Sequence, residues 1–148
     1  QQASLTKAEN IRQQIEREKA EANAEGERLI RVPIQTRRKG FPIVKVRFND
    51  RYTFDMAVDM ASNQTIMSES MASLLQLQST PGGYIYTTTG QRIPVSNGWV
   101  RSMQLHAATM VNVQVTIAPN LSEGILGRDF FAQYSVRILD HEIELYRR

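Results

Sequence analysis

Apolar and charged residues alternate on both sides of a turn pair at Asn49-Asp50. The alternating apolar residues are Val44, Val46 and Phe48 before the turn, and Tyr52, Phe54, Met56 and Val58 after it. A period of two places every second side chain on one face, which is typical of a strand with one buried side. The pattern predicts a β-hairpin whose second strand runs directly into Asp59.

The pattern changes to a helical one over residues 68–77. Ser68 is a good N-cap residue, and Glu69 places a negative charge in the first turn. We expect a short helix here that turns Met71, Leu74 and Leu75 toward the core.

Short apolar segments separated by turn residues fill the rest of the chain. Pro81-Gly82-Gly83 interrupts the chain, and a tight turn is expected near Thr89-Gly90. The predicted strands cover residues 84–88, 91–95, 99–105, 110–117, 125–127, 136–139 and 143–146. A helical turn is expected at 128–131, and Trp99 is expected in the core or partly buried. These elements predict an all-β domain, closed like a barrel, with one or two short helices.

The N-terminal residues have a helical rather than a strand-like pattern. Residues 5–28 are rich in Ala, Glu, Gln, Lys and Arg, which favours a helix. Leu5, Ala8, Ile11 and Ile15 recur at helical spacing, but the apolar stripe then fades into alanine. We favour a linker or membrane-proximal stalk over a pairing helix, because so weak a stripe specifies a coiled coil poorly. The chain is therefore divided into a helical extension, 1–31, and a β domain, 32–148.

Composition and charge exclude several classes of function. The 148 residues contain no cysteine, so thiolate metal sites and cysteine nucleophiles are excluded. The net charge of +3 is modest, and the basic cluster Arg37-Arg38-Lys39 is best read as a solvated loop rather than a nucleic-acid surface. His106 and His141 have no partners at metal-ligand spacing. We expect no metal, cofactor or nucleic acid, and membrane contact only through a segment upstream of Gln1.

Two short motifs carry the candidate chemistry. The apolar strand Phe54–Val58 delivers Asp59 into a loop of small and polar residues, and Ile125-Leu126-Gly127 precedes the expected helical turn much later in the chain. With a hairpin between them, this plan resembles the retropepsin-like aspartic proteases, especially the bacterial single-domain members. The resemblance spans about Val32 to Arg148 and leaves out the N-terminal helix.

The resemblance implies a fold, a site and an assembly. Asp59 takes the position of the catalytic aspartate, and Ile125, Leu126 and Gly127 form the second motif. The hairpin between the motifs takes the place of the family's flap, with residues Tyr84, Ile85, Tyr86, Thr87, Thr88, Thr89, Gly90 and Gln91. Two carboxylates about 3 Å apart share one proton, so that one activates water while the other protonates the substrate carbonyl. One motif supplies one aspartate, and the resemblance therefore implies a homodimer acting on a peptide or protein.

The chain departs from the family pattern directly after Asp59. The family has Thr or Ser followed by Gly, whereas this chain has Met60 and Ala61; Ser62 fits the small position that follows. Met60 lacks the hydroxyl that interlocks the two loops in the family, and a soft apolar contact between the two methionines is the expected replacement. Two functions stay open: a weak aspartic endopeptidase, which we favour slightly, and an inactive module that binds or scaffolds peptides. Asp129 and Asp140 are read as residues of turns.

Overall fold

The protein is mostly β-structure with one long helix, as predicted. The computed structural model describes the backbone of residues 2–148, and the side chains of residues 7–20 and 29–148. The helices are α1 (Gln2–Arg28) and α2 (Glu69–Leu74). The strands are β1 (Leu29–Pro33), β2 (Thr36–Arg38), β3 (Phe41–Phe48), β4 (Tyr52–Val58), β5 (Ile66–Ser68), β6 (Ser79–Tyr86), β7 (Arg92–Leu105), β8 (Ala108–Ala118), β9 (Gly124–Leu126), β10 (Tyr134–Ile138) and β11 (Glu142–Arg147).

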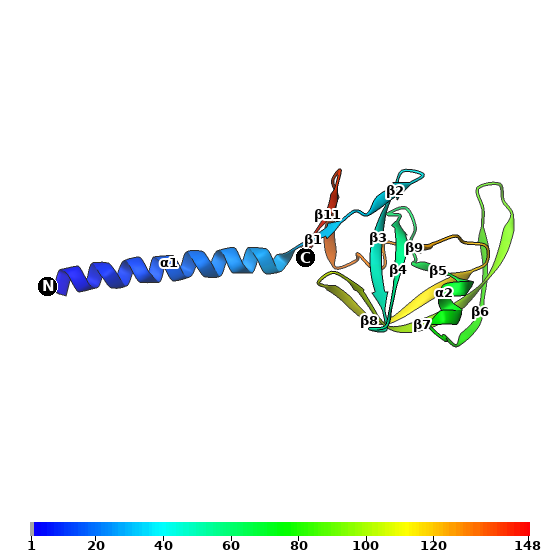
Figure 1. The fold of residues 1–148 in the computed structure, drawn as a ribbon, viewed down its shortest axis with the longest axis horizontal. Helices are drawn as coiled ribbons and strands as arrows, with labels where there is room; N and C mark the ends of the chain where they lie inside the picture. Colours follow the sequence, from blue (N-terminus) through cyan, green and yellow to red (C-terminus); the bar gives the residue numbers. More distant parts are fainter. Residues whose placement is uncertain (1) are drawn as a thin grey trace.

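One large sheet forms the body of the molecule. Its strand order is β2-β3-β4-β9-β5-β8-β7-β6, and β3 also pairs with β7. This extra pairing, at Arg47 opposite Gln104 and Phe48 opposite Met103, curls the sheet into a barrel-like shape. Figure 1 shows the strands wrapped around a common interior.

β3 and β4 form the predicted hairpin around Asn49-Asp50. Val44 lies opposite Met56, and both are fully buried. Asn49 and Asp50 adopt φ angles of 54° and 55°, a left-handed conformation that Asn and Asp tolerate better than most residues. The Asn49 side chain also accepts hydrogen bonds from the backbone of β7, which fixes the turn against its neighbour.

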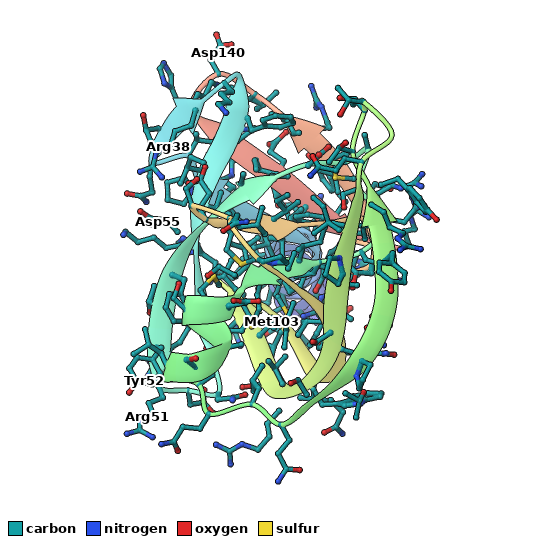
Figure 2. The ribbon with its side chains drawn as sticks, turned by 90° about the vertical axis from the view of Figure 1, so that its right-hand side faces the viewer. Arg38, Arg51, Tyr52, Asp55, Met103 and Asp140 are labelled. Atoms are coloured by element: carbon teal, nitrogen blue, oxygen red, sulfur yellow. The ribbon has the colours of Figure 1, made fainter. Side chains whose placement is uncertain are left out.

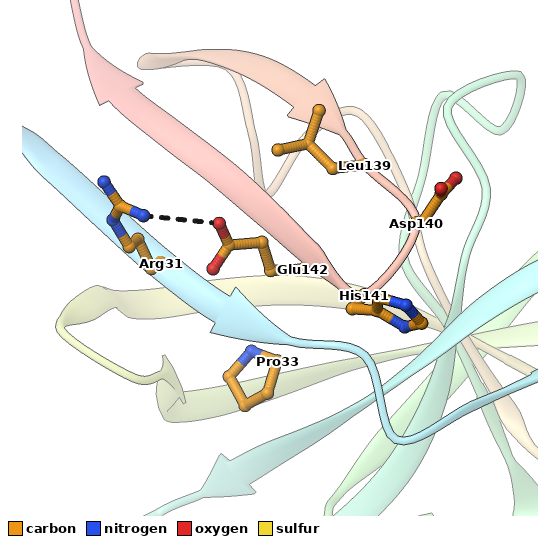
Figure 3. A pocket seen from close by; sticks show the side chains of 6 residues that line it. All are labelled: Arg31, Pro33, Leu139, Asp140, His141 and Glu142. Carbon is orange, nitrogen blue, oxygen red and sulfur yellow. Dashed lines mark hydrogen bonds and ion pairs between the residues drawn. The ribbon is translucent and has the colours of Figure 1, made fainter.

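A second, smaller sheet contains both ends of the β domain. Its order is β1-β11-β10, all antiparallel. Arg31 of β1 forms an ion pair with Glu142 of β11 at 3.4 Å, beside a hollow of about 470 Å³ that Asp140 and His141 also line (Figure 3). The predicted closing hairpin around Asp140-His141 is confirmed.

The helix α1 leads directly into β1 and extends away from the sheets as a single rod (Figure 1). Its described side chains, residues 7–20, are all exposed, including Ile11 at 59% and Ile15 at 45%. In the described part of the chain, no helix is both long and apolar enough to cross a membrane.

Several details of the sequence interpretation are wrong. Pro81-Gly82-Gly83 does not interrupt the chain but lies within β6, where the register shifts between Pro81 and Tyr84. Arg37 and Arg38 are exposed but belong to the strand β2 rather than to a loop.

The predicted strands 91–95 and 99–105 form one strand, β7, which begins at Arg92, because Asn97 and Gly98 pair with β6 on one side and β8 on the other. Trp99 is 62% exposed, since its neighbours Gly98 and Val100 take the inward positions of the strand. Leu74 is 52% exposed, whereas Ala72 lies in the buried face of α2.

The N-terminus of α2 is capped as predicted. The Ser68 side chain accepts a hydrogen bond from the backbone N–H of Met71, and Met71 is buried in the core. The cap satisfies a donor that a helix N-terminus otherwise leaves unpaired.

Candidate functional site

Parallel pairing of β4 with β9 brings the two sequence motifs together. Met56, Ala57 and Val58 lie opposite Gly124, Ile125 and Leu126. The pairing continues past the strand end, where the backbone N–H of Asp59 donates to the carbonyl oxygen of Leu126 at 3.1 Å. Asp59 and Gly127 therefore follow adjacent strand ends, as the sequence interpretation expects.

The loop after β4 holds the Asp59 side chain through its own backbone. The N–H of Ala61 donates to Asp59 Oδ1 at 2.9 Å, and the N–H of Ser62 donates to the Asp59 carbonyl at 3.1 Å. Ser62 Oγ donates in turn to the Gln64 carbonyl at 2.7 Å. Asp59 is half-buried, so its carboxylate is oriented by the loop while remaining accessible to solvent.

Gly127 is glycine because the Asp59 loop crosses directly over it. A Cβ at this position would lie 2.5 Å from the carbonyl oxygen of Gln64 and 2.9 Å from that of Ser62. Both are backbone atoms, which cannot move aside as a flexible side chain can. The next residue adds a further attachment, because the N–H of Arg128 donates to the Ser62 carbonyl at 2.8 Å. The second motif thus supports the loop of the first.

Thr65 and Asp129 complete this support, and the sequence interpretation missed their role. Thr65 is fully buried; its N–H donates to Asp129 Oδ2 at 3.0 Å and its hydroxyl to Asp129 Oδ1 at 2.7 Å. The interpretation of Asp129 as a turn residue is incomplete, although Asp129 also accepts from the N–H of Phe130 at 2.8 Å. The sequence could have indicated these hydrogen bonds only if the two motifs were known to be adjacent. Thr65 follows the Asp59 loop and Asp129 follows Gly127, so adjacency of the motifs brings the two side chains together.

Met60 and Ala61, the two departures from the family pattern, fit this loop without strain. Ala61 is exposed and has a negative φ, so a Cβ is accommodated here. Met60 is partly buried and packs against the hydrophobic core of its own chain. Its side chain therefore has an apolar environment within one protomer.

A pocket of about 370 Å³ opens beside Asp59. It lies between the turn after β2 and the segment before β9, and its lining residues are Arg38, Lys39, Phe41, Ala57, Asp59, Asn120, Leu121, Ser122, Glu123 and Ile125. Arg38 forms a close ion pair with Glu123 and a longer one, 4.0 Å, with Asp55. The pocket thus combines an apolar lining with a charged rim, and it holds two half-buried carboxylates, those of Asp59 and of the Arg38-paired Glu123.

The predicted flap segment, Tyr84 to Gln91, consists of the end of β6 and the turn that joins it to β7. The N–H of Thr87 donates to the Gln91 carbonyl and that of Gly90 to the Thr87 carbonyl, both at 2.9 Å, and Gly90 has a φ of 82°. Tyr84 and Tyr86 are 51% and 71% exposed. The tip of this hairpin lies toward the same end of the molecule as Arg38 of the Asp59 pocket (Figure 2).

Among the described residues, no cluster of three or more His, Cys, Asp or Glu side chains could hold a metal ion. The chemistry available at the pocket is that of the Asp59 carboxylate, because the other lining carboxylate, Glu123, forms an ion pair with Arg38. One carboxylate can act as a base toward water, but the second proton-transfer group of a two-carboxylate mechanism has to come from elsewhere.

Comparison with known proteins agrees with this geometry. The sequence profile of the aspartyl protease family matches residues 44–130, which include the Asp59 loop and Gly127. The structure resembles that of a retropepsin-like aspartic protease from Rickettsia conorii, with a TM-score of 0.67 and 14% identity over 80% of this chain and 92% of that one.

A second similar structure is the EIAV protease in complex with the inhibitor HBY-793, with a TM-score of 0.55 and 16% identity. The match covers 67% of this chain and 92% of that one. No curated protein matches the chain significantly in sequence. The family profile covers more than half of the chain, and the fold is that of the retropepsin-like proteases: this chain belongs to the aspartyl protease family.

Proposed function

We propose that the protein is an aspartic endopeptidase that acts as a homodimer, with the Asp59 carboxylates of two protomers forming the catalytic pair. The observation that carries the proposal is the half-buried Asp59 carboxylate, held by the Ala61 N–H at 2.9 Å and open to a pocket. A lone loop aspartate would not need this support from Gly127 and its neighbours. Residues 32–148 would form the protease domain, with residues 1–31 as an extension.

The proposed reaction follows from the charges of the pair. Two carboxylates about 3 Å apart cannot both ionise, so the singly protonated pair prevails in the acid range. The ionised member takes a proton from water, which attacks the peptide carbonyl, and the protonated member gives its proton to the carbonyl oxygen. The β6–β7 hairpin, Tyr84 to Gln91, would close over a peptide bound in extended form.

Turnover is expected to be weak. Met60 packs in its own core and has no hydroxyl to bind the partner's loop. Less firmly held loops misplace the two carboxylates, and a displacement of about 1 Å can lower the rate about a hundredfold.

The packing of Met60 against the core of its own chain supports a second candidate function. A chain with the fold and Asp59, but with Met60 turned into its own core, could bind extended peptides in the pocket without cleaving them. Such a module would use backbone hydrogen bonds to a peptide strand.

Cleavage of a peptide library between acid and neutral pH separates the two functions. We expect cleavage at acid pH by the wild type and none by Asp59→Asn, which keeps the size of the side chain. Equal inertness of both proteins, together with measurable peptide binding, would favour the binding module.

A further inference from the structure

Thr65 makes four hydrogen bonds, through its N–H, hydroxyl and carbonyl groups, to two other segments of the chain. Its N–H and hydroxyl donate to Asp129, and its hydroxyl oxygen accepts from the N–H of Gly127 at 3.2 Å. Its carbonyl accepts from the N–H of Thr116 on β8 at 3.1 Å. Since Thr65 is fully buried, none of these bonds competes directly with water.

These bonds fix the far end of the Asp59 loop. The near end is fixed by the bond from Asp59 N–H to Leu126, and the middle by the bond from Arg128 N–H to Ser62. The Asp59 carboxylate in turn depends on the loop, because it accepts from the N–H of Ala61. A displacement of Thr65 would therefore move the backbone of the loop, and with it the Ala61 N–H that orients the Asp59 carboxylate.

Apolar packing contributes little to holding the Asp59 loop in position. Of the loop residues between Asp59 and Thr65, Met60 alone is hydrophobic and packed against the core, while Ala61, Asn63 and Gln64 are exposed. The Asp129 carboxylate accepts three hydrogen bonds, two of them from Thr65. Hydrogen bonds to an ionised acceptor are stronger and more directional than neutral ones, which suits them to holding a loop in one position.

We propose that Asp129 is a positioning residue for Asp59, acting through Thr65. It holds the Asp59 loop from within its own chain, and so supplies a restraint that Met60 cannot provide across a dimer axis. Asp129 does not touch the reacting atoms. The predicted effect of Asp129 on catalysis rests on the proposed function. Its effect on the position of the Asp59 loop can be measured even if the protein is inactive.

Three variants test the proposal. Thr65→Val keeps the shape of the side chain and removes the hydroxyl, and Asp129→Asn removes one acceptor oxygen. Thr65→Ser is the conservative variant, because it keeps the hydroxyl that Thr65→Val lacks. We expect the first two to lower kcat at least tenfold with KM within about twofold, because a transition-state geometry is disturbed rather than peptide binding. Thr65→Ser should recover most of the rate. Unchanged kcat in both Thr65→Val and Asp129→Asn would overturn the proposal.

Hydrogen exchange provides a readout that needs no activity. The amides of Ala61 and Ser62 should exchange at least tenfold faster in Thr65→Val and Asp129→Asn than in the wild type. Ser68→Ala is the matched control, since it removes another buried hydroxyl bond at the cap of α2. Unchanged exchange in the loop, or equal acceleration in Ser68→Ala, would overturn the proposal. An inert wild type with accelerated loop exchange in the variants would contradict the proposed function and support the positioning role.

Discussion

At the scale of single residues, the site depends on a close approach between two pieces of backbone. Gly127 lies under the loop that carries Asp59, and the nearest atoms to an added Cβ would be backbone carbonyl atoms of Gln64 and Ser62. Gly124 is also crowded, but there the nearest atom is the terminal methyl of Met56, 2.7 Å away. The two glycines therefore offer a comparison between a rigid neighbour and a flexible one.

Gly127→Ala should lower the free energy of unfolding by about 1–3 kcal/mol, the usual range for forcing extra volume into a packed site. Gly124→Ala should cost less, because the methionine side chain can choose another rotamer. Thermal or urea denaturation of the two variants measures the difference. Equal stability of Gly127→Ala and the wild type would show that the loop is free to move away from Gly127.

Met60 and Ala61 make a second comparison at this scale. Replacing them together by Thr and Gly supplies the hydroxyl and the free backbone approach that the family pattern has. We expect peptide cleavage by the double variant to rise about tenfold or more over the wild type, since firmer loops place the carboxylates better. Ala61→Gly alone should change little, because Ala61 is exposed and unstrained. No rise in the double variant would argue that Met60 is not what limits turnover.

At the scale of elements, period-two alternation predicts strands better than it predicts where they end. The β3–β4 hairpin could be predicted directly, because apolar and polar residues alternate along most of both strands and the turn residues are typical, although Pro42 to Val44 and Met56 to Val58 are buried without alternation. The single strand β7 could not, because Asn97-Gly98 is typical of a turn. Gly98 in fact lies inside the strand against β8, where a Cβ would lie 2.9 Å from the terminal methyl of Ile117. Trp99 was misplaced for a related reason, since hydrophobicity alone does not say which face a residue takes.

The β6–β7 hairpin should be the most mobile strand pair of the domain. Pro81 to Tyr84 contains a register shift, Gly83 has a φ of 83°, and Tyr84 and Tyr86 are exposed. Few buried contacts mean a low local stability, so amides near Thr87 and Gly90 should exchange faster than those of Met56 and Val58 in β4. Exchange as slow at the hairpin tip as in β4 would argue against a flap.

At the scale of the whole molecule, the sequence did not predict hydrogen bonds between side chains that lie far apart in the chain. The adjacency of Asp59 and Gly127 followed from a resemblance to known proteins rather than from spacing. The bonds between Thr65 and Asp129 could not be read in advance, because they exist only once β4 and β9 are paired in parallel. Local patterns determine which segments become strands, whereas the site depends on contacts that only the assembled sheet creates.

The assembly predicted at this scale is a homodimer, because one protomer supplies one Asp59. Sedimentation at micromolar concentration should give about twice the mass of one chain. The N-terminal helix offers a check on the interface, since removal of residues 1–28 should leave the dimer intact if the Asp59 loop and the sheet of β1, β10 and β11 form the contact. A monomer at these concentrations would count against a paired site.

The central claim is that two Asp59 residues meet on a twofold axis, and the absence of cysteine from the chain allows a direct measurement. In Asp59→Cys, the two new thiols should come close enough to form a disulfide, which needs Cα atoms about 4.4–6.8 Å apart. Asp50→Cys is the control, an exposed site in the β3–β4 turn. After mild oxidation, mass analysis without reductant should find covalent dimers of Asp59→Cys and monomers of Asp50→Cys. Monomers of both variants, or equal crosslinking of both, would contradict the account.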